Sequence, residues 1–265
     1  MKVIFLFFAV VVLLAMPAIT DSGEDPVSKG EAIAREADRR DLGFGDTTAE
    51  LKMILENRSG QTSERRLRIS ILEVPDENDG DKSVVIFDRP RDIRGTALLS
   101  YAHILEPDDQ WLYLPALKRV KRISSSNKSG PFVGSEFAYE DITAQELKKY
   151  SYQWVRDEPC GALECFVVER RPLYEKSGYT RLITWYDKAE YRMQRVEYYD
   201  RKNDLLKTLT FSDYRQYLGK YWRAHDLYMV NHQTGKKTRL VYENYGFRTG
   251  VSEQDFTRSR LKQMR

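Results

Sequence analysis

The chain has 265 residues, and its 43 Lys and Arg stand against 40 Asp and Glu, which gives a formal net charge of +3 at pH 7. A chain of this length can bury a substantial core within one domain. Charged residues make up 31% of the sequence, but the two signs are interspersed rather than collected on one basic face, which argues against a nucleic-acid partner.

The N-terminus has the pattern of a secretory signal. The apolar run Val3–Met16 is 14 residues long, whereas a membrane-spanning helix needs roughly 20. Pro17 breaks the run, and small residues occupy positions −3 and −1 before Asp21. We therefore expect residues 1–20 to be a cleaved signal peptide and residues 21–265 to form a single domain. An uncleaved N-terminal anchor is the alternative.

The first element expected after this signal is a short helix. Ser28 can cap its N-terminus, with Glu31 three residues later as the reciprocal partner. An apolar stripe follows and ends near Gly43, a residue type that commonly ends helices. The stripe consists of Ala32, Ile33, Ala37 and Leu42.

After this helix the dominant period is two, which is typical of strands with one dry and one wet face. Strands are expected around 51–55, 67–71, Val84–Phe87, Ala97–Tyr101, Trp111–Leu114, Arg119–Ile123, Phe137–Tyr139, Tyr150–Trp154, Cys165–Glu169, Thr180–Tyr186, Arg192–Tyr199, Leu205–Tyr214, Tyr221–Val230 and Arg239–Tyr245. Turn residues separate most of these segments. Roughly a dozen strands at this spacing predict a barrel, a part-barrel or a sandwich.

One stretch breaks this rhythm. Ser124–Pro131 is polar and of flexible composition, and the aromatic residues Phe137 and Tyr139 follow it. Asp141 or Thr143 can then cap a short helical turn. Such a stretch can form the rim or lid of a cavity. An ordinary long hairpin connection has the same composition, and the sequence leaves both interpretations open.

Two cysteines, Cys160 and Cys165, are separated by four residues. In an oxidising compartment, a close pair across a turn predicts a structural disulfide. Closing so short a loop stabilises the fold by about 2 kcal/mol in the chain-entropy description. The three histidines, His103, His225 and His232, do not have the spacing of metal ligands, so no metal site is predicted.

No catalytic motif is recognisable. The sequence lacks a G-x-S-x-G elbow, a P-loop and a dinucleotide-binding fingerprint. The carboxylate pairs Asp108-Asp109 and Glu140-Asp141 lie in turn-like contexts, where turn formation and helix capping explain them. We therefore predict neither an enzyme nor a cofactor, and we assign no catalytic residue.

The sequence is rich in aromatic residues, with 4 Trp, 17 Tyr and 11 Phe. Most of them are expected in the core, as in other β proteins, and the rest can line a cavity. Burying one methylene gains about 0.8 kcal/mol, so an acyl chain of ~14 methylenes represents ~11 kcal/mol. A cavity lined by aromatic side chains can therefore hold a lipid tail.

Basic residues cluster between Lys118 and Lys128, where Arg119 and Arg122 alternate with apolar side chains. This cluster is either the wet face of a strand or a docking patch for a membrane surface or an acidic partner.

Three motifs in the middle of the chain resemble a known family. The stretch from Phe87 to Leu99 reads FDRPRDIRGTALL, the stretch from Trp111 to Ile123 reads WLYLPALKRVKRI, and residues 134–141 read GSEFAYED. In this order the motifs resemble the LolA-like proteins known as outer-membrane lipoprotein-sorting proteins. These form a branch of the lipoprotein-carrier superfamily that is often associated with RND-type exporters.

The resemblance implies a mainly β fold: a curved antiparallel sheet that forms an incomplete, half-open barrel, with short helices plugging or covering its concave side. It also implies a periplasmic carrier that holds the acyl chains of lipoproteins, or another lipid or hydrophobic ligand, in a concave cavity. Such a carrier moves its cargo between the inner and outer membranes, with transient membrane contact and an inner-membrane RND-type exporter as partner. The extra C-terminal strands depart from the shorter lipoprotein carriers.

Position and polarity select the residues expected at this site. The expected cavity lining is Leu51, Met53, Leu67, Ile69, Phe87, Trp111, Tyr113, Phe137 and Tyr139. Arg119 and Arg122 are expected to contact an anionic headgroup or the exporter. The alternative function is a non-enzymatic periplasmic adaptor that binds an exporter instead of lipid. An outer-membrane barrel is disfavoured, because both faces of the expected strands carry charges.

Overall fold

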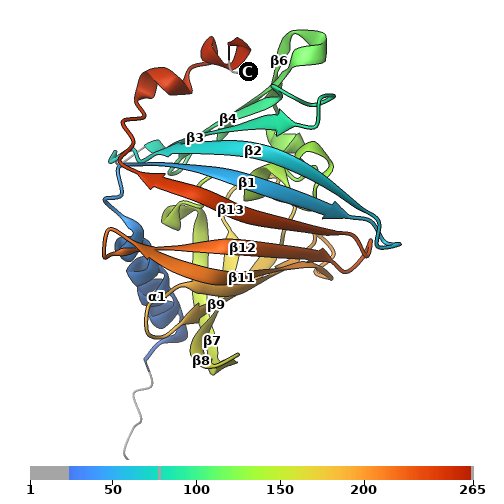
Figure 1. The fold of residues 1–265 in the computed structure, drawn as a ribbon. Coiled ribbons are helices and arrows are strands. Elements are labelled where there is room, and N and C mark those ends of the chain that lie inside the picture. Colours follow the sequence, from blue (N-terminus) through green and yellow to red (C-terminus); the bar gives the residue numbers. More distant parts are fainter. Residues whose placement is uncertain (1–23, 77–78, 264–265) are drawn as a thin grey trace, which may run out of the picture.

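The computed structural model describes residues 24–76 and 79–263. The expected signal peptide, residues 1–20, lies outside the described residues. Within the described part the chain forms one α-helix and then a run of antiparallel strands, which short 3-10 turns interrupt (Figure 1). No helix in that part is long and apolar enough to cross a membrane.

Thirteen strands of the described residues form one sheet. Their bounds are β1 Asp46–Glu56, β2 Thr62–Leu72, β3 Asp79–Arg89, β4 Ala97–His103, β5 Asp109–Leu114, β6 Arg119–Ile123, β7 Tyr150–Cys160, β8 Leu163–Pro172, β9 Arg181–Asp187, β10 Met193–Tyr199, β11 Leu205–Tyr217, β12 Tyr221–Asn231 and β13 Lys237–Phe247. Most of the expected strands are therefore present. The expected strand at Phe137–Tyr139 is wrong, because this stretch forms only an isolated bridge and a 3-10 turn.

The strand order shows that the sheet does not close. β1 pairs with β13, so the first and last strands meet in the middle of the sheet, while β6 and β7 are its two free edges. The sheet bends around α1 and around residues 124–149, which connect one free edge to the other (Figure 1). The expectation of a curved, half-open antiparallel barrel is confirmed. We call the side that faces α1 the concave face and the other side the convex face.

The helix α1 spans Pro26–Asp41 and packs against β7. Its cap is Asp25 rather than the expected Ser28: the Asp25 carboxylate accepts a hydrogen bond from the Ser28 backbone N–H at 3.0 Å. Pro26 suits this arrangement, because proline is favoured in the first turn. The helix lies so close to β7 that a Cβ on Gly30 would be 2.6 Å from the Trp154 backbone nitrogen. Only glycine fits at this contact.

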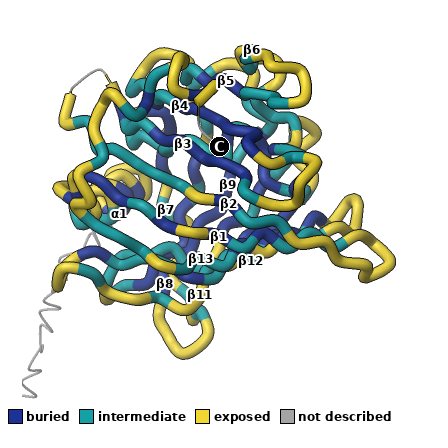
Figure 2. Tube along the Cα trace, turned by 45° about the horizontal axis from the view of Figure 1, so that its top comes forward, coloured by how far each residue is buried: buried dark blue, intermediate teal, exposed yellow. Residues whose placement is uncertain are grey.

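Alternation along the strands divides the side chains between two faces. The concave face carries the largest core cluster, which α1 joins through Ile33 and Ala34. Buried residues lie along the strands of the sheet, and exposed residues lie mainly at the tips of the hairpins (Figure 2). The sheet and its helix thus share one continuous core.

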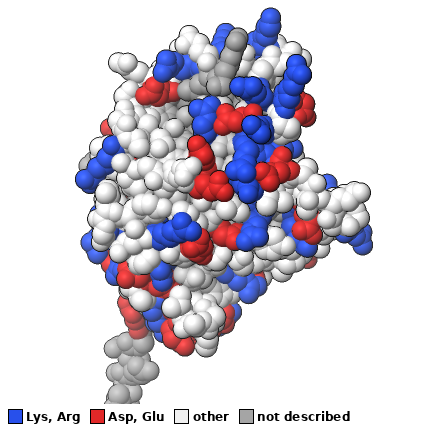
Figure 3. Space-filling view, in the orientation of Figure 1, with Lys and Arg blue, Asp and Glu red and all other residues white. Residues whose placement is uncertain are grey.

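The middle of the convex face carries charged side chains. Cross-strand ion pairs cover it, such as Arg68 with Asp88 at 2.9 Å and Arg66 with Glu243 at 3.1 Å. Acidic and basic side chains are interleaved there, with neither sign dominating (Figure 3). A band of paired charges therefore crosses the middle of this face.

Near β3–β5 the convex face is apolar instead, and the C-terminal tail covers it. Phe256 and Leu261 of the tail are completely buried against residues such as Val84 and Leu99. Two short 3-10 turns, Glu253–Phe256 and Arg260–Lys262, place these side chains. A second core therefore lies on the outside of the sheet.

The two cysteines lie where β7 turns into β8. A disulfide joins Cys160 to Cys165, with 5.9 Å between their Cα atoms. The turn between the two strands is short, so the bridge fastens the end of this hairpin.

Candidate functional site

The concave side is filled by residues 124–149, which we call the inner segment. This segment links β6 to β7, the two opposite edges of the sheet, so it is not the hairpin connection that one interpretation of the sequence suggested. It forms 3-10 turns at Ser125–Asn127, Phe132–Gly134, Tyr139–Asp141 and Leu147–Lys149 and an isolated bridge between Pro131 and Ala138. The sheet therefore encloses a strand-free stretch of its own chain.

Aromatic side chains of the inner segment fill the space between the two halves of the sheet. Phe132 and Phe137 are 1% and 3% exposed and belong to the concave core cluster. The Phe132 ring lies 5.7 Å from the ring of Phe87, a residue of β3, and 5.8 Å from that of Tyr139. These side chains therefore occupy the apolar interior of the concave side.

The structure brings most of the expected lining residues together. Leu51 and Met53 of β1, Leu67 and Ile69 of β2, and Phe87 of β3 all belong to the concave core cluster or pack against it. Phe137 and Tyr139 reach the same cluster from the inner segment. These positions are consistent with a cavity lining, and whether a ligand touches them stays a prediction.

Trp111 and Tyr113 were expected in this lining, and that placement is wrong. Both lie on the convex face, in the core that Phe256 of the C-terminal tail covers. Their neighbour Leu112 is the residue of β5 that faces the concave core. Alternation correctly puts Trp111 and Tyr113 on one face, but apolar residues occupy both faces of β5.

The two arginines expected to contact a headgroup or a partner lie on β6, a free edge of the sheet. Arg119 is exposed, and Arg122 pairs with Asp109 of β5. Both side chains are exposed, so any role for them lies at the surface.

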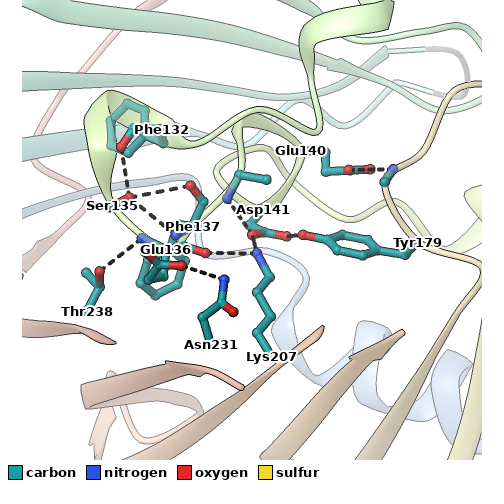
Figure 4. Close-up of polar contacts among 12 residues, drawn as sticks. Phe132, Ser135, Glu136, Phe137, Glu140, Asp141, Tyr179, Lys207, Asn231 and Thr238 are labelled. Carbon is teal, nitrogen blue, oxygen red and sulfur yellow. Dashed lines mark hydrogen bonds and ion pairs between the residues drawn. The ribbon is translucent and has the colours of Figure 1, made fainter. Parts of the chain in front are cut away.

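A buried ion pair anchors the inner segment to the sheet (Figure 4). The ammonium group of Lys207 on β11 donates to the Asp141 carboxylate at 2.6 Å, and both side chains are only 3% exposed. The same ammonium group donates to the Glu136 backbone carbonyl at 2.9 Å. Tyr179 donates its hydroxyl to the other Asp141 oxygen at 2.8 Å.

Glu136 and Ser135 provide further anchors. Asn231 of β12 donates to the Glu136 carboxylate at 2.7 Å, and the Glu136 backbone N–H donates to the Thr238 hydroxyl at 3.0 Å (Figure 4). Ser135 donates to the Phe132 carbonyl at 2.8 Å, which holds the tight turn between the two phenylalanines. These contacts determine where the aromatic side chains lie.

Glu140 fastens the inner segment to the loop between β8 and β9. Its carboxylate accepts hydrogen bonds from the Gly178 backbone at 2.8 Å, the Ser177 hydroxyl at 2.9 Å and the Tyr174 hydroxyl at 3.2 Å. Burial, together with the adjacent Asp141 carboxylate, raises the pKa of Glu140. The GSEFAYED stretch is therefore the part of the inner segment that fixes it inside the sheet.

These anchors were not predicted from the sequence. Glu140-Asp141 was predicted to be a turn and capping pair, and Asp141 does accept a hydrogen bond from the Ala138 backbone N–H at 2.7 Å. The additional role of Asp141 depends on Lys207. The sequence does indicate that Lys207 faces the core, because alternation in β11 places it on the same face as the buried Leu209.

The C-terminal end of the inner segment brings carboxyl groups close to the start of β3. A Cβ on Gly80 would lie 2.1 Å from a Glu146 carboxylate oxygen, so a side chain at this position would displace that carboxylate. Burial raises the pKa of the neighbouring Asp81 to about 7, and Glu146 and Glu73 add to the effect. Burial also raises the pKa of Glu146.

This arrangement predicts a pH dependence. Asp81 binds its proton more tightly in the folded state, so its contribution to stability is full below pH ~4 and is lost as the pH rises towards 7. Between pH 5 and 7, acidification should raise the free energy of unfolding by up to about 1.4 kcal/mol per pH unit from this group. Urea denaturation at several pH values measures this effect. In Asp81→Asn the free energy of unfolding should change less steeply with pH than in the native chain. An unchanged dependence on pH would exclude Asp81 as its source.

Other chemistry has no evident site in the part of the chain that the structure describes. There, no three His, Cys, Asp or Glu side chains gather in an arrangement that could hold a metal ion. Asp108, one of the paired carboxylates noted in the sequence, pairs with Lys149 at the end of the inner segment. Asp108 thus has a structural partner.

Comparisons with known proteins agree with this geometry. A family model described as "Uncharacterized protein" matches residues 79–263. The crystal structure of a candidate outer membrane lipoprotein-sorting protein domain from Vibrio parahaemolyticus is 54% identical over 89% of this chain and 99% of that chain, with a TM-score of 0.86. A DUF1329 family protein from Desulfovibrio piger is 30% identical over 90% of this chain and 100% of that chain, with a TM-score of 0.85.

A more distant structure shares the fold alone. It is a LolA superfamily protein from Nitrosomonas europaea, 20% identical over 87% of this chain and 98% of that chain, with a TM-score of 0.69. No curated protein matches the sequence.

Proposed function

The chain belongs to the LolA-like superfamily, and we propose that it is a periplasmic carrier whose concave face takes up acyl chains when the inner segment moves aside. The observation that carries this proposal is the position of Phe132 and Phe137, which fill the apolar interior from a segment without regular secondary structure. The cargo is a lipoprotein or another lipid. The protein acts as a carrier and not as an enzyme.

The energetics suit reversible exchange. Burying a phenylalanine side chain gains about 1.5–3 kcal/mol, and an acyl chain of ~14 methylenes gains ~11 kcal/mol when fully buried. A lipid tail can therefore replace the aromatic side chains and also offset the loss of the polar anchors. The inner segment stores strain as well, because Val133 has φ +47°, a left-handed conformation that is unfavourable for a β-branched residue.

The remaining parts of the proposal follow from the family. Residues 1–20 direct export and are removed, which leaves one LolA-like domain from residue 21 to residue 265. Arg119 and Arg122, on the free edge β6, are suited to an anionic headgroup or to an inner-membrane RND-type exporter. Contact with either membrane is transient, because a carrier must release its cargo.

We expect delipidated protein to bind a neutral fluorescent acyl probe. Met53→Gln should weaken this binding roughly tenfold, because it buries an amide in the acyl space. Met53 is buried in the concave core on β1, and Ile54→Gln, which places the same side chain on the opposite face of that strand, is the matched control. A fluorescence titration gives both affinities.

Native mass spectrometry of gently purified protein provides the second readout. Co-purified lipid supports the carrier. A protein that neither binds the probe nor carries lipid would contradict the proposal and would favour an adaptor that binds an exporter.

A further inference from the structure

One arginine inside the sheet has no charged partner among the residues that the structure describes. Arg170 lies on β8, is 4% exposed, and points into the concave core. Among the described residues its guanidinium donates one hydrogen bond, to the Gln145 side-chain oxygen at 3.0 Å. Its Nε–H has no hydrogen-bond partner there. A guanidinium group stays protonated, so this is a buried positive charge whose hydrogen-bond partner is a neutral amide.

The other buried cations of this interior are paired. Lys207 meets Asp141, and Lys149 meets Asp108. The neighbours of Arg170 are instead aromatic, and its guanidinium lies 5.3 Å from the Tyr150 ring. Tyr186, Tyr150, Tyr152 and Tyr198 are the titratable side chains grouped around it. An unpaired buried charge is unfavourable, so its presence points to a function.

A second polar group without a partner lies beside Arg170. Thr184 of β9 is completely buried, and its hydroxyl has no hydrogen-bond partner among the described residues. Arg170 pairs in register with Leu182, so Thr184 is its diagonal neighbour on the same face. Diagonal neighbours on adjacent strands are within reach of long side chains. Two donors with unused hydrogen-bonding capacity, one of them charged, thus lie on the same face of adjacent strands in the interior.

We propose that Arg170 and Thr184 bind the anionic head of a lipid, a carboxylate or a phosphate, that enters this interior. This inference rests on the proposed carrier function and names the class of its cargo. Gln145 belongs to the inner segment, so the movement that opens the acyl space also takes the amide away from Arg170. Arginine forms strong, directional hydrogen bonds with carboxylates and phosphates, and the desolvated site strengthens them.

Competition between lipids with identical chains tests this. Tetradecanoate, tetradecyl phosphate and tetradecanol should each displace a neutral acyl probe from the delipidated protein. A hydrogen bond to a charged group contributes enough for at least one of the two anions to compete about 10–100-fold better than the alcohol. Comparison of the two anions distinguishes a carboxylate head from a phosphate head.

Two variants separate the anion site from the acyl site. Arg170→Gln should remove the preference for the anion and leave tetradecanol binding intact, and Thr184→Val should reduce the preference without a change of charge. Arg171→Gln is the matched control, since Arg171 is the next residue, lies exposed and pairs with Glu169. If Arg170→Gln does not fold, the Thr184→Val result decides.

The outcomes are distinguishable. Equal competition by the alcohol and both anions would overturn the anion site and leave the carrier function standing. Failure of all three to displace the probe would contradict the carrier function itself. An anion preference that survives Arg170→Gln, or Thr184→Val where the first variant does not fold, would also overturn the assignment.

Discussion

Replacing Asp141 with alanine should lower the free energy of unfolding by about 3–5 kcal/mol. The substitution leaves Lys207 charged and 97% inaccessible to solvent, since its side chain is only 3% exposed. It also removes the acceptor of the Tyr179 hydroxyl. Urea denaturation measures the loss, and it should exceed the effect of any surface ion pair.

Two comparisons isolate the buried charge as the cause. Glu64→Ala removes a carboxylate from a surface pair with Arg66, whose side chains are 48% and 41% exposed, and should cost about 0–1 kcal/mol. Combining Asp141→Leu with Lys207→Met removes both charges and should recover most of the stability. If Asp141→Ala were no worse than Glu64→Ala, the ion pair would not be an anchor of the inner segment.

The second large expected effect concerns aromatic side chains in the concave and convex cores. Phe137→Ala and Phe256→Ala each remove a buried ring, from the concave and the convex core respectively. Each should lower the free energy of unfolding by about 3–5 kcal/mol. Only Phe137→Ala should gain more stability from a bound lipid than the native chain does, because its cavity lies at the proposed site of the acyl chain.

Thermal unfolding with and without a neutral acyl ligand provides the measurement. Ligand at 100 times its Kd stabilises a protein by about 2.7 kcal/mol. In Phe137→Ala the inner segment packs less well, so ligand competes with it more easily and the gain in Tm should exceed that of the native chain. Phe256→Ala should gain no more than the native chain does. Equal gains in the two variants would place the ligand outside the concave core.

The periodicity of the sequence predicted which side chains share a face. It grouped Leu51 with Met53 and Leu67 with Ile69, and the structure keeps each pair together on the concave face. It could not state which face of a strand turns inwards. For Trp111 this mattered, because the C-terminal tail covers the convex face of β5 with Phe256, and that contact joins residues far apart in the chain.

The inner segment was harder to predict for a related reason. Its composition indicated a loop and its aromatic residues suggested a rim, but its course depends on the position of the two free edges, β6 and β7. The partner of Asp141 is Lys207, 66 residues later. Similarly, Arg170 and Arg171 are adjacent in the sequence. Only the alternation of side chains along β8 places Arg170 in the interior and Arg171 on the exposed face.

Probe binding by protein whose inner segment is fixed in place tests the central claim most directly. Glu136 and Asn231 are in side-chain contact at 2.7 Å, so Glu136→Cys with Asn231→Cys can be joined by a short thiol cross-linker, while Cys160 and Cys165 are already bonded to each other. Joining Arg66→Cys to Glu243→Cys across the convex face is the control. We expect the inner cross-link to abolish binding of the neutral acyl probe and the outer one to leave it unchanged. Undiminished binding with the inner segment fixed would contradict the account.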